Sequence, residues 1–332
     1  MSLGVNYVWN YCKEVDLSYL GFSGKFMSGF DFQKYTKGSS TCLGIPSKTI
    51  QIVGHEYAAK RKQFKKQSLS WRSNKRNLGW IPFDKQQIKV VGGAVLFGCR
   101  NYKLFYSRSL DGVSILSGSF TEDSKGNWFI NLQVRRNIEP KQKTGSIVGI
   151  DLGLKTVGTT SDGEELSRPN YTKLYAEKLA LAQRAKKKKQ VTNIHKKIKN
   201  KRDDWNKRTA ARLVEKYDYI AVGDVKSNSI IKKNKMAKSV YDAAWYGLKS
   251  ALVTTAIKRG VDFHIVKESY STVTCSYCKQ KTGPSGLSGL GVREWKCSSC
   301  GTVHKRDINA AKNILSNSVQ GIAPQLRESL GL

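Results

Sequence analysis

The sequence contains no long hydrophobic run. Nowhere in its 332 residues do apolar side chains approach the roughly 18 in succession that a membrane-spanning helix needs. The N-terminus also lacks the positively charged and then apolar pattern of a secretory signal. We therefore expect a cytoplasmic protein that has no membrane partner.

Acidic side chains are scarce as well. Asp and Glu number 25 against 58 Lys and Arg, which gives a formal net charge of +33 at pH 7. In an isolated compact particle this charge would cause strong self-repulsion, so a polyanion is the expected partner. A ribosomal-type protein, another nucleic-acid binder or a generally basic, solvated surface would each fit, and composition alone does not indicate an enzyme.

Cysteine is sparse and unevenly placed. Three of the seven cysteines are scattered singly: Cys12, Cys42 and Cys99. The other four form two C-x-x-C pairs that are 18 residues apart: Cys275 with Cys278, and Cys297 with Cys300. This distribution favours a metal site with reduced thiols elsewhere over a disulfide framework.

The four paired cysteines predict a zinc ribbon. Each pair would sit on a tight knuckle, so that four thiolates close a tetrahedral shell around Zn²⁺. A closed shell leaves no open position for water, and we therefore expect the zinc to be structural. His304 lies close enough in the sequence to compete as a ligand, but four thiolates suffice, and we interpret it as a surface histidine.

The chain is long enough for two domains. Residues 5–20 and 46–69 have the pattern of helices. Residues 79–136 contain short apolar runs separated by Gly, Asn or Asp, which is typical of an antiparallel β-barrel or sandwich. Residues 136–146, with one proline and several charges, are the predicted linker.

The second half of the chain alternates apolar runs with helical segments. Residues 147–151, 219–223 and 261–266 are candidate strands, and residues 172–216 and 237–259 are candidate helices between them. Such alternation predicts an α/β sheet with at least some parallel pairing.

Two aspartates stand at the ends of predicted elements. Asp151 terminates an apolar run, and Asp307 opens a helical segment at residues 308–316. Either could be structural, because Asp after a strand starts turns and Asp at a helix start serves as an N-cap. Taken singly, neither residue indicates a catalytic site.

Taken together, the two aspartates lie in motifs that resemble a known family. Gly149-Ile-Asp151-Leu-Gly153 and Asp307-Ile-Asn309-Ala-Ala-Lys-Asn313 flank the four-cysteine insert. They resemble the first and third RuvC motifs of the TnpB family, transposon-encoded relatives of type V CRISPR effectors. Five further segments extend the resemblance over nearly the whole chain: Trp9–Cys12, Lys34–Lys37, Tyr57–Lys66, Leu78–Pro82 and Arg293–Trp295.

The resemblance implies an α+β multidomain fold. An N-terminal wedge-type β-barrel with a helical recognition insert would be followed by an RNase H-like α/β RuvC domain that carries the inserted four-cysteine zinc ribbon. The implied domains are the helical recognition region at 1–78, the barrel at 79–140, the first RuvC part at 147–268, the ribbon at 269–304, and the last RuvC part with the C-terminal tail at 305–332.

The resemblance also implies RNA-guided cleavage of DNA. In the family the guide is an RNA from the transposon end, the target is double-stranded DNA beside a short adjacent motif, and the cofactor is Mg²⁺, expected as two ions. It implies a monomeric ribonucleoprotein associated with the prokaryotic nucleoid. A nuclease-inactive RNA-guided DNA-binding protein and a compact type V CRISPR effector are the alternatives.

A third carboxylate is expected in the second RuvC motif. Two hard cations about 3.5–4 Å apart need shared and terminal carboxylate oxygens. Asp151 and Asp307 alone supply few ligands for such a pair. The family normally ends the matching strand with Glu, but here that strand ends with Gly223. Glu268, which follows the run 261–266, is the favoured replacement, as in a family branch with a relocated glutamate that this sequence resembles.

Two other outcomes stay open for the third ligand. Asp224 follows Gly223 directly, but consecutive strand residues point to opposite faces, so Asp224 would need a bulge or a local twist to reach the ions. A site without any third ligand would leave a guided protein that binds DNA and does not cut it.

Basic segments predict the nucleic-acid surface. The run Lys60–Arg76 combines charge with Trp71, and residues 186–202 concentrate lysine on a helical stretch. A solvated helical face is the ordinary alternative for such runs, as a surface loop is for Lys34 and Tyr35. The predicted contacts are Lys34, Tyr35, Lys60, Arg61, Lys62, Lys65, Lys66, Trp71, Arg72, Arg76, Lys187, Lys188 and Lys196.

Overall fold

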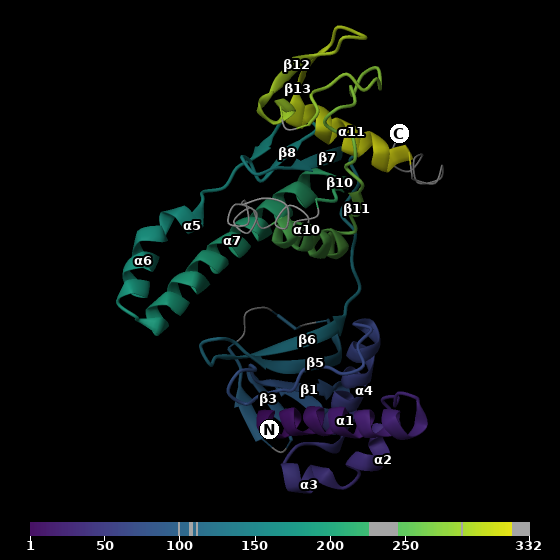
Figure 1. Ribbon diagram of the computed structural model, residues 1–332, viewed down its shortest axis with the longest axis vertical. Coiled ribbons are helices and arrows are strands. Elements are labelled where there is room, and N and C mark those ends of the chain that lie inside the picture. Colours follow the sequence, from purple (N-terminus) through teal and green to yellow (C-terminus); the bar gives the residue numbers. More distant parts are fainter. Residues whose placement is uncertain (99, 106–108, 111, 226–244, 287, 321–332) are drawn as a thin grey trace. The chain divides into compact units, whose positions relative to one another are not determined.

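The chain forms two compact units, Met1–Asn137 and Ile138–Leu332 (Figure 1). The computed structural model describes residues 1–98, 100–105, 109–110, 112–225, 245–286 and 288–320. Cys99, residues 237–244 of an expected helix and the tail after residue 320 lie outside these ranges. Within them, no helix is both long enough and apolar enough to cross a membrane.

Four helices open the first unit: α1 (Ser2–Ser23), α2 (Phe32–Thr36), α3 (Ser39–Leu43) and α4 (Ser47–Gln63). Helix α1 ends before Gly24, whose φ of 66° suits a residue without a Cβ. Helix α4 ends before residue 69, the predicted limit, because Lys65 turns into the left-handed region with φ 50°. The amide of Lys66 then donates to the carbonyl of Arg61 at 3.2 Å and closes a Schellman turn.

Two three-stranded antiparallel sheets follow in the first unit, with strand orders β1-β5-β6 and β2-β3-β4. The strands are β1 (Trp80–Asp84), β2 (Ile88–Val91), β3 (Ala94–Phe97), β4 (Arg100–Lys103), β5 (Ser114–Glu122) and β6 (Trp128–Arg135). Strand β1 opens the segment 79–136, which was predicted to be antiparallel β structure. It contains Pro82, and a proline lowers the strand signal of an apolar run.

One hydrophobic core joins these helices to both sheets. Trp9 of α1 meets Tyr57 of α4 edge to face, with 5.2 Å between ring centroids. Phe83 of β1 and Phe97 of β3 lie 5.8 Å apart and belong to the same buried cluster as the two helical aromatics. The helices and the two sheets of this unit therefore share a single core.

The second unit is built on a five-stranded sheet with the order β11-β10-β7-β8-β9. Its strands are β7 (Ile147–Leu152), β8 (Gly158–Thr160), β9 (Glu165–Leu166), β10 (Tyr219–Gly223) and β11 (Asp262–Val266). Strands β7, β10 and β11 run parallel, whereas β8 and β9 form an antiparallel meander with β7. The three long apolar runs of the second half are thus the three parallel strands.

Helices cover both faces of this sheet. Helices α7 (Lys188–Lys216) and α10 (Trp245–Arg259) pack on one face and α11 (Arg306–Gln320) on the other, while α5 (Tyr171–Leu174) and α6 (Ala176–Arg184) pack against α7. Alternate residues of β10 divide between the faces: Ile220 and Val222 pack with α7 and α10, while Tyr219 and Ala221 pack with Ile314 of α11. The period of two along the strand therefore decides which side chains face α11.

Helix α11 approaches β7 unusually closely. A Cβ placed on Gly149 would overlap the carbonyl oxygen of Ala311 and would lie 2.8 Å from the Cβ of Leu315. Only a residue without a side chain fits between this strand and the helix. The glycine of the first motif therefore sets the height of α11 above the sheet.

We predict that Gly149→Ala destabilises the second unit by at least about 1–3 kcal/mol, because the added methyl group must push α11 away from β7. The same exchange at Gly21, an exposed position in α1 with no atom within 4 Å of its Cβ, should be neutral or stabilising by up to about 1 kcal/mol. Urea unfolding of both variants checks this, and equal effects at the two positions would contradict the packing argument.

Candidate functional site

Polar side chains gather where the parallel strands of the second unit end. Asp151 lies in β7, Gly223 ends β10, and Glu268 follows the end of β11. The register pairs Val222 with Ile150 and Gly223 with Val266. Because the carboxyl ends of parallel strands meet at one edge of a sheet, these positions lie side by side.

The same positions face α11. Gly149, two residues before Asp151, packs beneath α11, so alternation places Asp151 on that face too. A Cβ on Gly223 would lie 3.1 Å from Ile314 of α11, which puts Gly223 on the same side. Asp307 stands in the first turn of this helix. Strand ends and a helix start thus converge on one edge of the sheet.

The side chain of Glu268 lies over Gly223. A Cβ on Gly223 would come within 2.8 Å of Oε2 of Glu268 and within 3.4 Å of its Cβ. The amide of Ser271 donates to the carbonyl of Glu268 at 3.0 Å and turns the chain there. The space that a larger residue would fill at position 223 is therefore occupied by a carboxylate from the neighbouring strand.

The three carboxylates are near enough to influence one another electrostatically, but among the described residues only the four cysteines bring their ligand atoms within 4.8 Å of one another. Burial and the negative charges of Glu268 and Asp307 together raise the pKa of Asp151 to about 8, against the opposing charge of Arg306. Burial also raises the pKa of Glu268, against the effect of Lys249. Buried carboxylates that disfavour one another's ionisation are an arrangement that a bound cation would relieve.

Asp224 points to the other side of the sheet. Its Oδ1 lies 3.7 Å from Nζ of Lys249 in α10, and α10 covers the face opposite α11. Its backbone amide donates to the carbonyl of Val266 at 2.8 Å, which continues the parallel ladder. The alternation of strand residues therefore holds here.

The side chains at this edge of the sheet provide carboxylate oxygens, which are hard metal ligands. Asp151, Glu268 and Asp307 are each partly buried, and carboxylates are the side chains that Mg²⁺ and Mn²⁺ prefer. Arg293 approaches Asp307 with 3.4 Å between Nη1 and Oδ2. The set fits a divalent cation by donor type, and the pKa values of Asp151 and Glu268 are raised.

The four paired cysteines form a cluster. Their sulfur atoms all lie within 4.8 Å of one another, with 3.8 Å from Cys275 to Cys300 and 3.6 Å from Cys278 to Cys297. Both distances are too long for a disulfide, whose sulfurs are about 2.05 Å apart. They suit the edges of a tetrahedron with metal–sulfur bonds of about 2.3 Å, so the predicted four-thiol metal site is confirmed as a geometry that can hold a metal.

Two similar turns present these thiols. In the first, the amide of Lys279 donates to the carbonyl of Cys275 at 3.0 Å, and Lys279 has a φ of 63°. In the second, the amide of Gly301 donates to the carbonyl of Cys297 at 2.9 Å, and Gly301 has a φ of 75°. Each pair therefore sits on a tight knuckle that ends in a left-handed residue.

The interpretation of His304 as a surface residue is wrong. Its side chain is 8% exposed, and its ring packs against Trp295 with 4.8 Å between centroids. Its Nε2 lies 3.0 Å from the sulfur of Cys275. The pairing of β12 (Glu294–Lys296) with β13 (Val303–Lys305) places both rings on one side of a hairpin, a tertiary effect that the isolated sequence does not reveal.

Sequence reasoning assigned no role to two buried asparagines of α11. Asn309 and Asn313 are 1% and 3% exposed, and both donate to backbone carbonyls of the loop before the first knuckle. Their spacing of four residues puts them on one helix face. Amides recurring on an otherwise apolar helical face are the signal that could have identified them.

Several predicted nucleic-acid contacts serve the interior of the first unit instead. Arg61 is 7% exposed, pairs with the buried Asp16 and donates to the carbonyl of Met27 at 2.9 Å. Arg72 lies over the rings of Trp9 and Trp80, 5.7 and 5.6 Å from their centroids. A charged side chain held in this way is not free to neutralise a phosphate group.

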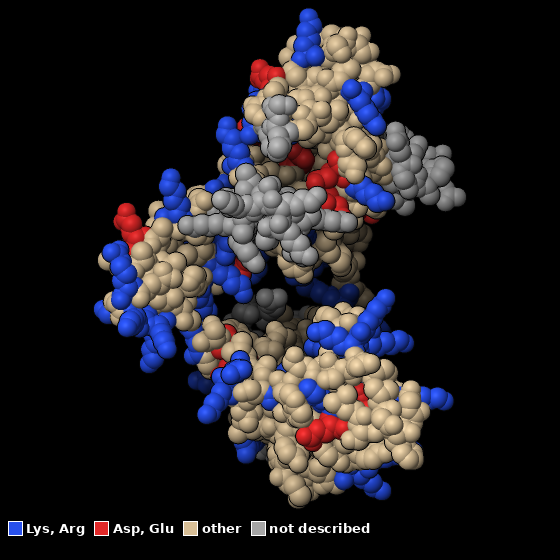
Figure 2. All heavy atoms as spheres, viewed as in Figure 1, with Lys and Arg blue, Asp and Glu red and all other residues tan. Residues whose placement is uncertain are grey.

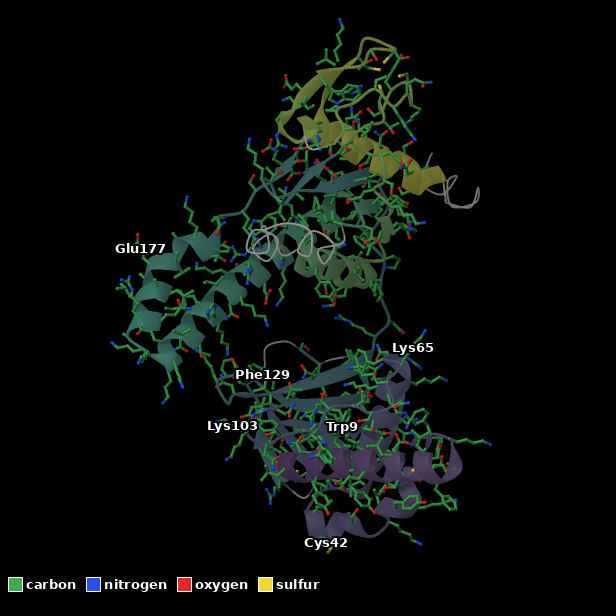
Figure 3. All side chains as sticks on the ribbon, viewed as in Figure 1. Trp9, Cys42, Lys65, Lys103, Phe129 and Glu177 are labelled. Atoms are coloured by element: carbon green, nitrogen blue, oxygen red, sulfur yellow. The ribbon has the colours of Figure 1, made fainter. Side chains whose placement is uncertain are left out.

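Other predicted contacts lie at the surface. Trp71 is 51% exposed and carries Nζ of Lys13 above its ring at 4.4 Å. Lys65 lies just past the end of α4 (Figure 3). Figure 2 shows Lys and Arg gathered over the helical hairpin of α6 and α7, with few acidic side chains among them. The exposed members of the predicted set are Lys34, Tyr35, Lys62, Lys65, Lys66, Trp71, Arg76, Lys187 and Lys188.

We expect the four-cysteine cluster to hold a metal ion in the purified protein. Cys297→Ser should lower the bound metal well below one ion per chain and destabilise the second unit, because three thiolates no longer close the shell. Cys42→Ser, at an exposed cysteine outside the cluster, should leave the metal content unchanged. Elemental analysis by mass spectrometry measures both, and an unchanged content in Cys297→Ser would contradict the assignment.

Residues 129–234 match a family model described as "Probable transposase", and residues 245–314 match one described as "Cas12f1-like, TNB domain". In a solved structure, "Cryo-EM structure of the Cas12f1-sgRNA-target DNA complex", a chain matches with a TM-score of 0.62 and 12% identity, over 94% of this chain and 80% of that one. This match concerns the fold alone.

Two relatives connect the chain to a family. A "Putative RNA-guided DNA endonuclease" of Streptomyces pristinaespiralis is 32% identical over 313 residues, which cover 88% of this chain and 76% of the relative. A "TnpB-like protein" of Acanthamoeba polyphaga mimivirus is 29% identical over 184 residues, 53% of this chain and 34% of that protein. With identity this high over most of the bacterial relative, the chain belongs to the TnpB family.

Proposed function

We propose that this protein is an RNA-guided DNA endonuclease of a transposon, which cuts double-stranded target DNA beside a short adjacent motif. The observation that carries the proposal is the position of Glu268 over Gly223, on the face where Asp151 and α11 meet. It supplies the carboxylate that the strand itself lacks. The name of the bacterial relative supports the same activity.

The fold is proposed in finer terms as well. The strand order β11-β10-β7-β8-β9, with three parallel strands and an antiparallel meander, supports an RNase H-like RuvC domain at 147–268 and 305–332. The cysteine insert at 269–304 would be a structural Zn²⁺ ribbon. In the first unit, the sheets support a wedge-type barrel at 79–140, and the helices support a recognition region at 1–78.

The proposed cleavage chemistry depends on three carboxylates. A pair of Mg²⁺ ions, when bound, would activate a water molecule and stabilise the leaving 3′ oxygen. Asp151, Glu268 and Asp307 would hold the ions: the three residues stand at the same edge of the sheet, and the charges of Glu268 and Asp307 raise the pKa of Asp151. Lys249, which lowers the pKa of Glu268, would keep that carboxyl group ionised and ready to bind.

The partners are proposed from charge. The exposed lysines of the α6–α7 hairpin and those beyond α4 would neutralise the phosphates of guide RNA and target DNA. Trp71 offers an exposed face for base stacking. Arg61 is left out of this surface because it is buried against Asp16. We propose a monomeric ribonucleoprotein.

The proposed function is tested by cleavage of a plasmid library with the protein and its copurified RNA. Wild-type protein should cut matched DNA in Mg²⁺, and Glu268→Gln should lower the cleavage rate by about 100-fold or more while target binding stays unchanged, because the amide loses the charge that holds the ions. Binding is measured by filter retention without divalent cations.

Asp224→Asn is the matched control for this test. Asp224 pairs with Lys249, and its charge raises the pKa of Glu268; its removal should leave Glu268 at least as readily ionised, so this variant should keep cleavage within a few-fold of wild type. Loss of cleavage in Asp224→Asn with full activity in Glu268→Gln would reverse the assignment. A wild-type complex that binds matched DNA and leaves it uncut would identify a guided binding protein.

We predict that binding of divalent cations strengthens as the pH rises toward about 8, the pKa of Asp151 in the cation-free protein. Below that pH the cation must displace a proton, so its apparent affinity should increase by about tenfold per pH unit and then level off. By the same linkage, the raised pKa of Asp151 means that the folded protein without cations becomes less stable as the pH rises toward about 8. Calorimetric titration with Mn²⁺ at several pH values measures the slope, and a flat profile would contradict the buried carboxylate cluster.

A further inference from the structure

We infer that Asn309 and Asn313 are positioning residues that hold Glu268 and Asp307 in register across the cysteine insert. The inference rests on the proposed nuclease function and adds to it the means by which two ligands from separate segments are brought to one place. The hydrogen bonds between α11 and the loop 268–276 support it.

The two asparagines donate hydrogen bonds to the same pair of backbone carbonyl groups. Nδ2 of Asn313 donates to the carbonyls of Ser271 and Thr274 at 2.9 and 2.6 Å. Nδ2 of Asn309 donates to the same two carbonyls at 3.3 and 2.8 Å. Oδ1 of Asn309 accepts from the amide of Ser276 at 2.8 Å. One helix face therefore fixes three backbone groups of the loop.

This loop is the direct continuation of Glu268. The amide of Ser271, whose carbonyl both asparagines hold, donates to the carbonyl of Glu268 at 3.0 Å. Asp307 stands in the first turn of α11, two residues ahead of Asn309. A short series of hydrogen bonds thus links the backbone of one proposed ligand to the helix that carries another.

The loop also leads into the first knuckle, because Thr274 precedes Cys275. The asparagines therefore connect the metal-holding cysteines to the same carboxylates. Asn309, Asn313 and Ser271 are all at most 4% exposed, so water cannot readily replace the lost bonds. An aspartate in place of either asparagine keeps the shape of the side chain and loses both donated hydrogen bonds.

Asn313→Asp is the test variant. Its position in α11 is separated from Asp307 by more than one helical turn, and its added negative charge would by itself attract a cation. Weaker cation binding would therefore report displaced ligands. We expect the Mg²⁺ concentration for half-maximal cleavage and the dissociation constant for Mn²⁺ to rise by about 10- to 100-fold. Target binding and the metal content of the cysteine cluster should stay unchanged.

Asn317→Asp is the matched control, since Asn317 lies on an exposed position of the same helix and gains the same charge. It should behave like wild type in both cation measurements. Hydrogen exchange should accelerate in residues 268–276 of Asn313→Asp and remain unchanged in Asn317→Asp. If Asn313→Asp fails to fold, as judged by lost cysteine-bound metal, Asn313→Ala is measured in its place, because alanine suits a helix interior.

A wild-type half-maximal Mg²⁺ concentration and Mn²⁺ affinity in folded Asn313→Asp would overturn the inference. So would a fall in maximal rate alone, because a purely structural role reduces the active fraction without changing the cation dependence. If the wild-type complex does not cut DNA at all, the proposed function fails, whereas Mn²⁺ binding and hydrogen exchange still decide the role of the asparagines.

Discussion

The close approach of α11 to the glycines of the central strands is the constraint on which the second unit depends. Gly149 lets the helix backbone settle onto β7, and Gly223 leaves room beside Ile314 at the end of β10. A helix held at this height brings its first turn, with Asp307, to the edge where the parallel strands end. Residues that are far apart in the sequence therefore lie near one another at this edge.

The same close packing explains how a carboxylate can be supplied from a neighbouring strand. A side chain at position 223 would require the carboxylate of Glu268 to move away from its place over the strand end. Gly223 therefore leaves the space that Glu268, a longer side chain from the loop after β11, fills. Placing three acidic groups together is costly, as the raised pKa of Asp151 shows, and a bound cation offsets that cost.

Local patterns predicted the parts of this protein that depend on neighbours in the sequence. The spacing of the cysteines predicted the thiol cluster, and three apolar runs predicted the parallel strands. Residues whose roles come from distant contacts were missed. The sequence predicts a surface cation at Arg61, whereas the folded chain pairs it with the buried Asp16. It likewise predicts an exposed His304, which the β12–β13 hairpin buries.

The central claim is that Asp151, Glu268 and Asp307 share one site for divalent cations. The most direct measurement is an anomalous difference map from crystals of the protein–RNA complex grown with Mn²⁺. The account predicts peaks bounded by the carboxyl groups of these three residues, with Glu268 projecting over Gly223. Peaks coordinated by Asp224, or a Glu268 carboxyl group turned away from a bound ion, would contradict it.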